Sequence, residues 1–332
     1  TEEWLEKVEK ALGGRLPNYL VVQHMEPDHA GSIQKICTKY PQMQIVSNAK
    51  VFGMMPQFFD FDLTGRTITV KEGDTLSLGS HTLTFVMAPM VHWPEVMVTY
   101  EASEKILFSA DGFGKFGALS VEEDWTDEAR RYFINIVGKY GAQVQNLLKK
   151  AATLDIAMIC PLHGPVLKED LGYYIGKYLT WSSYEPEEDG IVIACASIHG
   201  NTKRAMLKFA EILKEKGAEN VKFFDLSRDD MAEAIAEAYQ YSKLVVACPT
   251  YDGVLFPCME DFLYHLKIKN FQNRKAAIVE NGTWAPVAGK QMRAYLEGMK
   301  NITLVEPTVT IKSTMSEKNL EELNALADAL LA

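Results

Sequence analysis

The sequence predicts two domains of different fold class: a mixed α+β domain, followed by a doubly wound α/β domain with a parallel sheet. At ~150 residues per domain, the 332 residues suit two domains. Up to about residue 118 the apolar runs are short and bounded by turn sequences, whereas the last part alternates apolar β-rich runs with helical stretches. The acidic stretch at 183–190 is typical of a linker, so we expect domains at 1–186 and 187–332.

The first domain is expected to begin with a helix and to continue with strands. Residues 1–14, TEEWLEKVEKALGG, form an acidic amphipathic pattern with no initiator Met and no apolar segment of a signal peptide. We therefore expect further strands of this domain to be encoded upstream or supplied by another chain. The predicted strands are YLVVQ, MQIVSN, RTITV, HTLTFVMAP, VMVTYE and KILFSAD, and helices are predicted near 125–150 and 169–182.

The second domain contains five apolar β-rich runs, each followed by a helical stretch. This alternation predicts a parallel, five-stranded, doubly wound sheet with short right-handed crossovers. The runs are IVIAC, VKFFDL, KLVVACP, KAAIVEN and ITLVEPTVTI, and the helices are predicted at 202–216, 229–240, 258–266, 288–298 and 316–331.

The overall composition argues against several classes of partner. Lys and Arg number 34 against 44 Asp and Glu, which gives a net charge of -10. A field of that sign repels phosphate backbones and anionic membranes, so we expect neither nucleic acid nor membrane as a partner. No apolar run approaches the ~20 residues of a membrane-spanning helix. The cysteines form no C-x-x-C pair and predict buried thiols of a reducing, cytoplasmic compartment; they are Cys37, Cys160, Cys195, Cys248 and Cys258.

Histidines and carboxylates gather where the predicted strands of the first domain end. The run after YLVVQ is His24-Met25-Glu26-Pro27-Asp28-His29. Alternate side chains of an extended segment point the same way, so we expect His24, Glu26 and Asp28 to converge and His29 to point elsewhere. Three further candidates each follow an apolar strand, namely His92, Asp111 and His163. Because a rigid sheet holds such side chains in fixed positions, the pattern favours a preorganised metal site.

A structural role is the competing interpretation of these histidines. A single histidine after a strand is more often a hydrogen-bonded structural residue than a ligand. Four such histidines in one domain, with a dense H-x-E-x-D-H among them, reverse that expectation. His81 and His265 have no comparable context, and we expect them to be surface or core residues.

Charge balance indicates how many metal ions this set would hold. Four neutral imidazoles together with Glu26, Asp28 and Asp111 carry three negative charges. Two divalent ions and one bridging hydroxide would balance them, and Asp111 is the natural carboxylate bridge. Mixed imidazole and carboxylate ligation with open positions suits iron in redox chemistry. Hydrolysis at a two-zinc site remains an alternative.

The second domain carries three loops at strand ends that together favour a flavin. The first is Ser197-Ile198-His199-Gly200-Asn201-Thr202, a hydroxyl-rich loop that opens a helix, where backbone N–H groups and the helix dipole bind phosphate. It matches neither the NTP-binding nor the dinucleotide-binding glycine motif, and it fits a monoester such as that of FMN, as in flavodoxins. The others, Pro249-Thr250-Tyr251-Asp252-Gly253 and Asn281-Gly282-Thr283-Trp284-Ala285-Pro286, follow the third and fourth strands, where Tyr251 and Trp284 could flank a flat ring.

The histidine and carboxylate pattern resembles the metallo-β-lactamase superfamily of two-metal hydrolases. Glu26, in place of the second histidine of that motif, resembles its diiron branch, the flavodiiron proteins (A-type flavoproteins). WSSYEPEED and ENGTWAPVAGK extend the resemblance over nearly the whole chain. It implies a metallo-β-lactamase-like αββα sandwich, with its N-terminal strands missing here, followed by a flavodoxin-like domain. It also implies that His24, Glu26 and His92 hold one iron and Asp28, His29 and His163 the other, with Asp111 bridging.

The resemblance further implies a function for the two domains. FMN would receive electrons one at a time from a rubredoxin-like donor and pass them to the diiron site, which reduces O2 to water or NO to N2O. A head-to-tail homodimer, or a dimer of such dimers, would place the FMN of one protomer against the irons of its partner. His199 departs from the family, which often has Tyr at that position.

Two other classes of function remain open at this point. One is a two-zinc hydrolase with an appended flavodoxin module, and Glu26 in place of histidine argues against it. The other is an electron carrier or scaffold whose metal domain is vestigial, and the full set of seven candidate ligands argues against that.

Overall fold

The computed structural model describes residues 1–332, which form two compact units. The first comprises Thr1–Glu123 and Ala142–Tyr178, and the second comprises Asp124–Gly141 and Leu179–Ala332. The second unit thus includes a segment that precedes the predicted boundary at residue 186, and that boundary stays a prediction of where the second domain begins. None of the helices has both the length and the apolar character needed to cross a bilayer.

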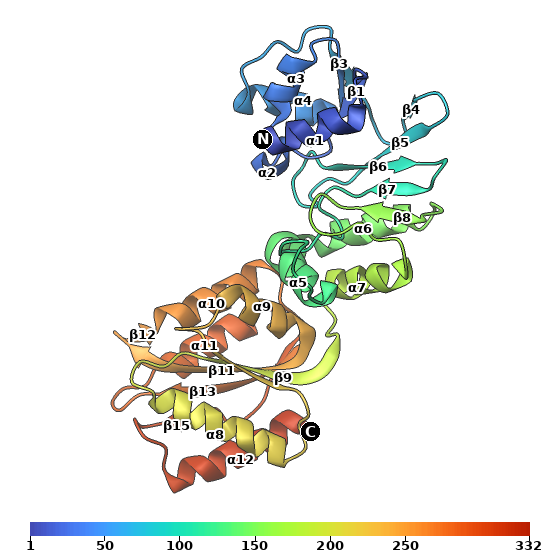
Figure 1. Cartoon of the computed structure of the whole chain (residues 1–332). Helices are drawn as coiled ribbons and strands as arrows, with labels where there is room; N and C mark the ends of the chain where they lie inside the picture. The colour runs from blue at the N-terminus through green and yellow to red at the C-terminus, as the bar shows by residue number, and fades with distance from the viewer. The chain divides into compact units, whose positions relative to one another are not determined.

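Two sheets form the centre of the first unit (Figure 1). The smaller sheet is parallel, and the larger is antiparallel except where its last two strands pair. Val46 of the smaller sheet and Val70, which directly follows the last strand of that sheet, share an apolar core with Phe85 and Met97 of the larger sheet. The strands are, in spatial order, β1 (Tyr19–Val21), β2 (Gln44–Ser47) and β3 (Thr67–Thr69), then β4 (Thr75–Ser77), β5 (Thr82–Met87), β6 (Met97–Glu101), β7 (Ile106–Phe108) and β8 (Met158–Cys160).

Helices cover the outer faces of both sheets in the first unit. Leu5, Ile36 and Met55 pack from α1 (Glu2–Leu12), α3 (Ile33–Lys39) and α4 (Ala49–Phe58) into a core that includes Ile45 of β2. Val144 of α6 (Gly141–Ala151) faces the larger sheet. The four layers α-β-β-α confirm the predicted sandwich.

The predicted helix near 125–150 is divided in the structure. It consists of α5 (Trp125–Tyr132), a π-helical turn at Phe133–Val137, a 3-10 turn at Gly138–Tyr140, and α6. Gly141 lies where the chain passes close to α7 (Leu171–Ser183), since an added Cβ would be 2.3 Å from the Ser182 carbonyl oxygen. A uniform helical pattern in sequence does not reveal such a close approach. The sequence also predicts no helix at α2 (Pro27–Ala30), α3 or α4, all of which are present.

The second unit is built on a parallel sheet with the strand order β10-β9-β11-β13-β14. In chain order this is the arrangement 2-1-3-4-5 of flavodoxin-like folds. The predicted fifth strand forms in two pieces, because Pro307 between them has no N–H for the ladder; both pieces pair with β13. The bounds are β9 (Glu188–Cys195), β10 (Val221–Asp225), β11 (Tyr241–Tyr251), β12 (Val254–Leu255), β13 (Arg274–Asn281), β14 (Ile302–Leu304) and β15 (Val309–Ile311).

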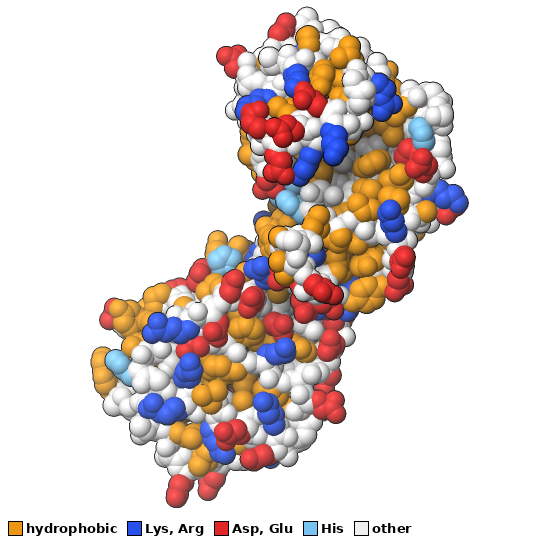
Figure 2. Space-filling model, in the orientation of Figure 1, with side chains coloured by type: hydrophobic (Ala, Val, Ile, Leu, Met, Phe, Trp, Pro, Cys, Tyr) orange, Lys and Arg blue, Asp and Glu red, His pale blue; other side chains and the backbone are white.

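Helices cover both faces of this sheet (Figure 1). Phe209 of α8 (Asn201–Glu215) and Leu326 of α12 (Glu317–Leu331) belong to the apolar core on one face. On the other face lie α9 (Met231–Gln240), α10 (Pro257–Ile268) and α11 (Ala288–Glu297). The doubly wound fold predicted from the β-α alternation is therefore confirmed. On the side shown in Figure 2, acidic and basic side chains are interspersed over both units.

Candidate metal centre and flavin pocket

The seven candidate ligands come together in the first unit, where loops leave the ends of β1, β5, β7 and β8. Their nitrogen and oxygen atoms form two groups, within each of which the atoms lie no more than 4.8 Å apart. One group is His24, Glu26, His92 and Asp111, and the other is Asp28, His29 and His163. This is the same division that the family resemblance implies.

Asp111 lies between the two groups. Its Oδ2 is 3.2 Å from His24 Nε2 and 3.1 Å from His92 Nε2, whereas its Oδ1 is 2.9 Å from His29 Nε2 and 3.7 Å from His163 Nε2. Both oxygens are buried without a hydrogen-bond partner. A buried polar atom left unsatisfied costs about 1–3 kcal/mol, and more if it is charged. Coordination of one cation by each oxygen would remove that cost, so the carboxylate fits a bridge between two metal ions.

The other two carboxylates are divided between the groups. Glu26 Oε2 is 3.4 Å from His24 Nε2 and 3.0 Å from His92 Nε2. Asp28 Oδ2 is 3.3 Å from His29 Nε2 and 3.1 Å from His163 Nε2. All four imidazoles therefore present Nε2 to a carboxylate oxygen of their own group. This set of imidazole nitrogens and carboxylate oxygens is suited to iron or zinc.

His29 does not point away from the other ligands, so that expectation is wrong. The extended geometry continues only to Glu26, because Pro27 begins α2. The N–H groups of His29 and Ala30 donate to the Glu26 carbonyl oxygen at 3.0 and 2.8 Å, which closes a helical turn. That turn brings His29 back to the side of the chain that faces Asp111.

Glu95 is a buried contact of this site that the histidine and carboxylate pattern does not single out. Its Oε1 lies 2.8 Å from His24 Nδ1 and accepts from the Met25 N–H at 3.0 Å. The side chains of both His24 and Glu95 are fully buried. A carboxylate on Nδ1 fixes the tautomer and the ring orientation, and so directs Nε2 to the ligand group. The available signal was the run His92-Trp93-Pro94-Glu95, which places a carboxylate three residues after a candidate ligand.

The electrostatics of the site favour cations. Burial lowers the pKa of His24, but the neighbouring carboxylates of Asp111 and Glu95 outweigh burial and raise the pKa to about 10. Burial raises the pKa of Asp111, yet His24, His29 and His92 hold that pKa well below its usual range. The buried carboxylates thus stabilise positive charge at this point of the protein.

The loops that carry His92 and Asp111 have strained backbones. Met90, Ala110 and Phe113 adopt positive φ angles of 65°, 51° and 67°. Such conformations cost about 1–3 kcal/mol each and persist only where the surrounding structure imposes them. At Gly114 an added Cβ would lie 3.2 Å from His163 Cβ. A small residue is therefore needed where the loop that carries Asp111 meets the loop that carries His163.

The second unit has a pocket of about 460 Å³ at the carboxyl ends of β9, β11 and β13. This volume lies within the ~300–1,000 Å³ typical of small-molecule sites. Ala285 of the third predicted loop lines it, and Val287 and Ser313 line it without having been expected; Ser313 follows β15, which ends at the same edge of the sheet. The expected residues that line it are Ser197, Ile198, His199, Asn201, Thr202, Pro249, Thr250, Asp252, Gly253, Asn281, Gly282, Thr283 and Trp284.

Two of the expected residues, Gly200 and Tyr251, are not among those that line this pocket. Gly200 is the N-cap of α8 with φ 87°, a conformation that favours glycine and lets the loop turn into the helix. The ring of Tyr251 packs edge-on against Phe256, with the ring centroids 5.4 Å apart. Trp284 is 83% exposed and is the aromatic side chain at the pocket.

Hydrogen bonds between the loops fix the shape of this pocket. Thr250 Oγ1 accepts from the N–H groups of Val287 and Ala288 at 2.9 and 3.2 Å. Asn281 donates to the Ser313 carbonyl oxygen and accepts from the Ser313 N–H, both at 2.9 Å. These two polar side chains therefore join the loops of the pocket to one another.

Known proteins resemble this chain in sequence and in the fold of both units. The family model described as ODP family beta lactamase matches residues 2–164. A nitric oxide reductase of Moorella thermoacetica is 28% identical over 100% of this chain and 84% of its own length. A rubredoxin-oxygen oxidoreductase of Megalodesulfovibrio gigas is 26% identical over 94% of this chain and 80% of its own. The crystal structure of the flavodiiron protein from Giardia intestinalis superposes with a TM-score of 0.90 and 26% identity, covering 99% of this chain and 82% of that one. The lactamase-like and flavodoxin-like folds, the paired ligand groups and these relatives together show that the chain is similar to the flavodiiron proteins over nearly its whole length.

Proposed function

We propose that this chain is an oxidoreductase that reduces O2 to water or NO to N2O at a non-haem diiron site, with electrons relayed through FMN. The observation that carries the proposal is the position of Asp111, whose two oxygens face two separate ligand groups. Two irons would supply valence changes and open coordination positions, and FMN would store two electrons and release them singly. The names of the relatives, an NO reductase and an oxygen oxidoreductase, support the same activity.

Each ligand group has a defined part in the proposed centre. His24, Glu26 and His92 would hold one iron, and Asp28, His29 and His163 the other, with Asp111 between them. The side chains of Glu26 and Asp28 are 35% and 46% exposed, whereas His24 and Asp111 are buried. Substrate would therefore enter on the side of the two exposed carboxylates.

Metal and flavin content separates this proposal from the two-zinc hydrolase. Glu26, in the place where the hydrolases have histidine, favours iron. Protein purified without oxygen should contain close to two irons and one FMN per chain, measured by elemental analysis and flavin absorbance. Two zincs with no iron would favour the hydrolase and contradict the proposal.

The proposed partners are a rubredoxin-like electron donor and a second copy of this chain. A donor is needed because a flavin that gives up electrons must be reduced again, and the name of the relative, rubredoxin-oxygen oxidoreductase, supports a rubredoxin-like carrier. We propose a head-to-tail homodimer, or a dimer of such dimers, that acts in the cytoplasm. Sedimentation of the holoprotein should give a dimer or a multiple of it, and a fully active monomer would contradict this arrangement.

We expect Asn201→Asp to weaken FMN binding. Asn201 is the first residue of α8 and lines the pocket, so an aspartate would place a negative charge beside the phosphate. Coulomb repulsion of about 1–4 kcal/mol at such distances predicts a rise in Kd of about 5-fold or more. Titration of the apoprotein with FMN measures the effect. Asn324→Asp adds the same charge on α12, at a residue that does not line the pocket, and should leave the Kd unchanged.

We also expect Trp284→Ala to weaken FMN binding and to raise its fluorescence. The exposed indole can stack on the flavin ring and quench its emission. Loss of one stacked aromatic costs about 0.5–1.5 kcal/mol, which is a rise in Kd of about 2- to 12-fold. Tyr251→Ala is the matched comparison, because its ring packs on Phe256 instead. Equal effects of the two substitutions would contradict the role given to Trp284.

A further inference from the structure

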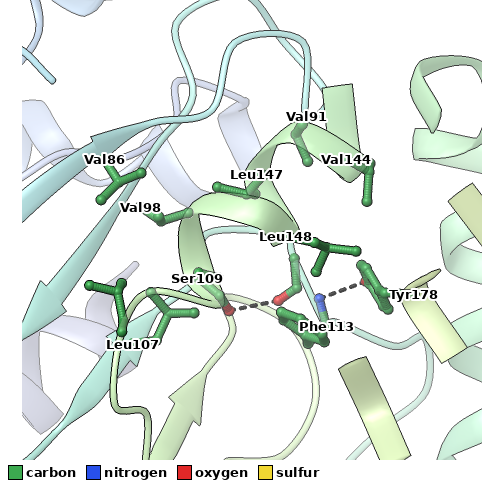
Figure 3. Close-up of a pocket in the computed structure, with 13 residues that line it drawn as sticks. Val86, Val91, Val98, Leu107, Ser109, Phe113, Val144, Leu147, Leu148 and Tyr178 are labelled. Carbon is green, nitrogen blue, oxygen red and sulfur yellow. Dashed lines mark hydrogen bonds between the residues drawn. The ribbon is translucent and has the colours of Figure 1, made fainter. Parts of the chain in front are cut away.

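A small internal cavity lies in the first unit between the larger sheet and α6 (Figure 3). Val98 of β6 and Leu107 of β7 line it from the sheet, and Val144 and Leu148 line it from the helix. Its volume is about 20 Å³, more than the ~10–15 Å³ that one water-sized molecule requires. The cavity is therefore large enough for a single very small molecule.

The wall of this cavity is apolar. Its two polar side chains are engaged with the backbone, since Ser109 Oγ donates to the Gly112 carbonyl oxygen at 2.6 Å and the Tyr178 hydroxyl accepts from the Phe113 N–H at 2.6 Å (Figure 3). An ordered water in a cavity needs about 2–4 polar partners. Valine and leucine side chains offer none, so the cavity favours a small apolar molecule over water.

The cavity borders the loops that carry two of the candidate metal ligands. Val91, which lines it, directly precedes His92. Ser109 and Gly112 also line it, and they stand on either side of Asp111 in the sequence. Val91 and Asp111 are buried. Part of the cavity wall thus belongs to the same two loops that carry His92 and Asp111.

We propose that this cavity is a binding site for an apolar diatomic gas, O2 or NO, that serves the metal centre. Both gases are apolar and uncharged. When either gas moves from water into an apolar cavity, it loses no hydrogen bond that the cavity wall would have to replace. The identity of the gas as substrate rests on the proposed function, whereas binding in the cavity does not. The site would raise the local concentration of substrate next to His92 and Asp111.

Crystals of the holoprotein under krypton pressure test the binding site itself. Krypton is a heavy, apolar atom similar in size to O2, and its anomalous scattering locates it. We expect a krypton atom among Val98, Leu107, Val144 and Leu148. A cavity that holds ordered water, or that stays empty under pressure, would overturn the proposal.

Val98→Ile and Val98→Ala test whether the cavity serves turnover. The added methylene of isoleucine fills the cavity, so Val98→Ile should abolish krypton binding and raise the KM for the gas several-fold. Val98→Ala enlarges the cavity and should retain krypton. In both variants kcat, iron content and FMN content should stay close to wild type. Val70→Ile makes the same change at a buried valine of this unit that does not line the cavity, and should leave both krypton binding and KM unchanged.

The outcomes separate this proposal from the proposed function. Krypton in the cavity of a protein that reduces neither gas would support the site and contradict the function. Normal gas reduction without krypton in the cavity would contradict the site and support the function. An unchanged KM in Val98→Ile with krypton excluded would show that substrate does not pass through the cavity, and would overturn its role in turnover.

Discussion

Asp111→Ala is expected to leave FMN bound and to reduce the iron content from two per chain to one or none. The side chain is fully buried, and its two oxygens face two different ligand groups, so its removal withdraws a ligand from both. Residues that only orient a ligand contribute about 10–100-fold to metal affinity or activity. A shared ligand contributes more, and we expect gas reduction to fall by more than ~100-fold.

Flavin content is an internal control for the loss of iron in Asp111→Ala. Asp111 lies in the first unit, whereas the pocket proposed for FMN belongs to the second, so flavin content and flavin absorbance should stay at the wild-type level. Unchanged circular dichroism would show that the fold is retained. Two tightly bound irons in Asp111→Ala would contradict the bridging position.

Glu95→Ala is expected to weaken iron binding, although Glu95 is not itself a candidate ligand. Without its carboxylate the His24 ring loses its partner at Nδ1, and Nε2 is no longer held toward Asp111 and Glu26. We expect iron affinity to fall by about 10–100-fold, measured by competition with a chelator. Glu95→Gln should recover part of this loss, because the amide oxygen still accepts from the Nδ1–H group.

Glu101 offers a matched control for Glu95. It is also a buried carboxylate beside an imidazole, with Oε1 3.2 Å from His81 Nδ1, but His81 belongs to neither ligand group. Glu101→Ala should therefore retain both irons. Equal loss of iron affinity in Glu95→Ala and Glu101→Ala would indicate a general effect on stability and contradict the positioning role of Glu95.

The sequence predicts those features that depend on short segments. The five β-rich runs of the second half each lead into a helix, and this local alternation is enough to predict the parallel sheet. Likewise, candidate ligands directly after apolar strands converge because strand ends meet at the edges of a sheet. The charge of Glu26, Asp28 and Asp111 indicates two cations, and the structure brings these three carboxylates together with four imidazoles.

Other features depend on contacts between distant residues and could not be predicted in this way. Glu95 contacts His24 across 71 positions of sequence, and no local pattern links the two residues. The orientation of His29 follows from a single helical turn that Pro27 begins, which reverses the direction expected for an extended chain. Tyr251 and Trp284 look equivalent in sequence, but the packing of Phe256 removes only Tyr251 from the pocket.

The most direct test of the central claim is the reoxidation of the reduced flavin by gas. Holoprotein reduced in the absence of oxygen should be mixed rapidly with O2 or with NO while flavin absorbance is recorded. We expect fast reoxidation by at least one gas in the wild type and a rate lower by more than ~100-fold in Asp111→Ala, in which FMN should remain and the paired metal should be lost. Equal rates in the two proteins would show that electrons leave the flavin without the metal centre and would contradict gas reduction at the diiron site.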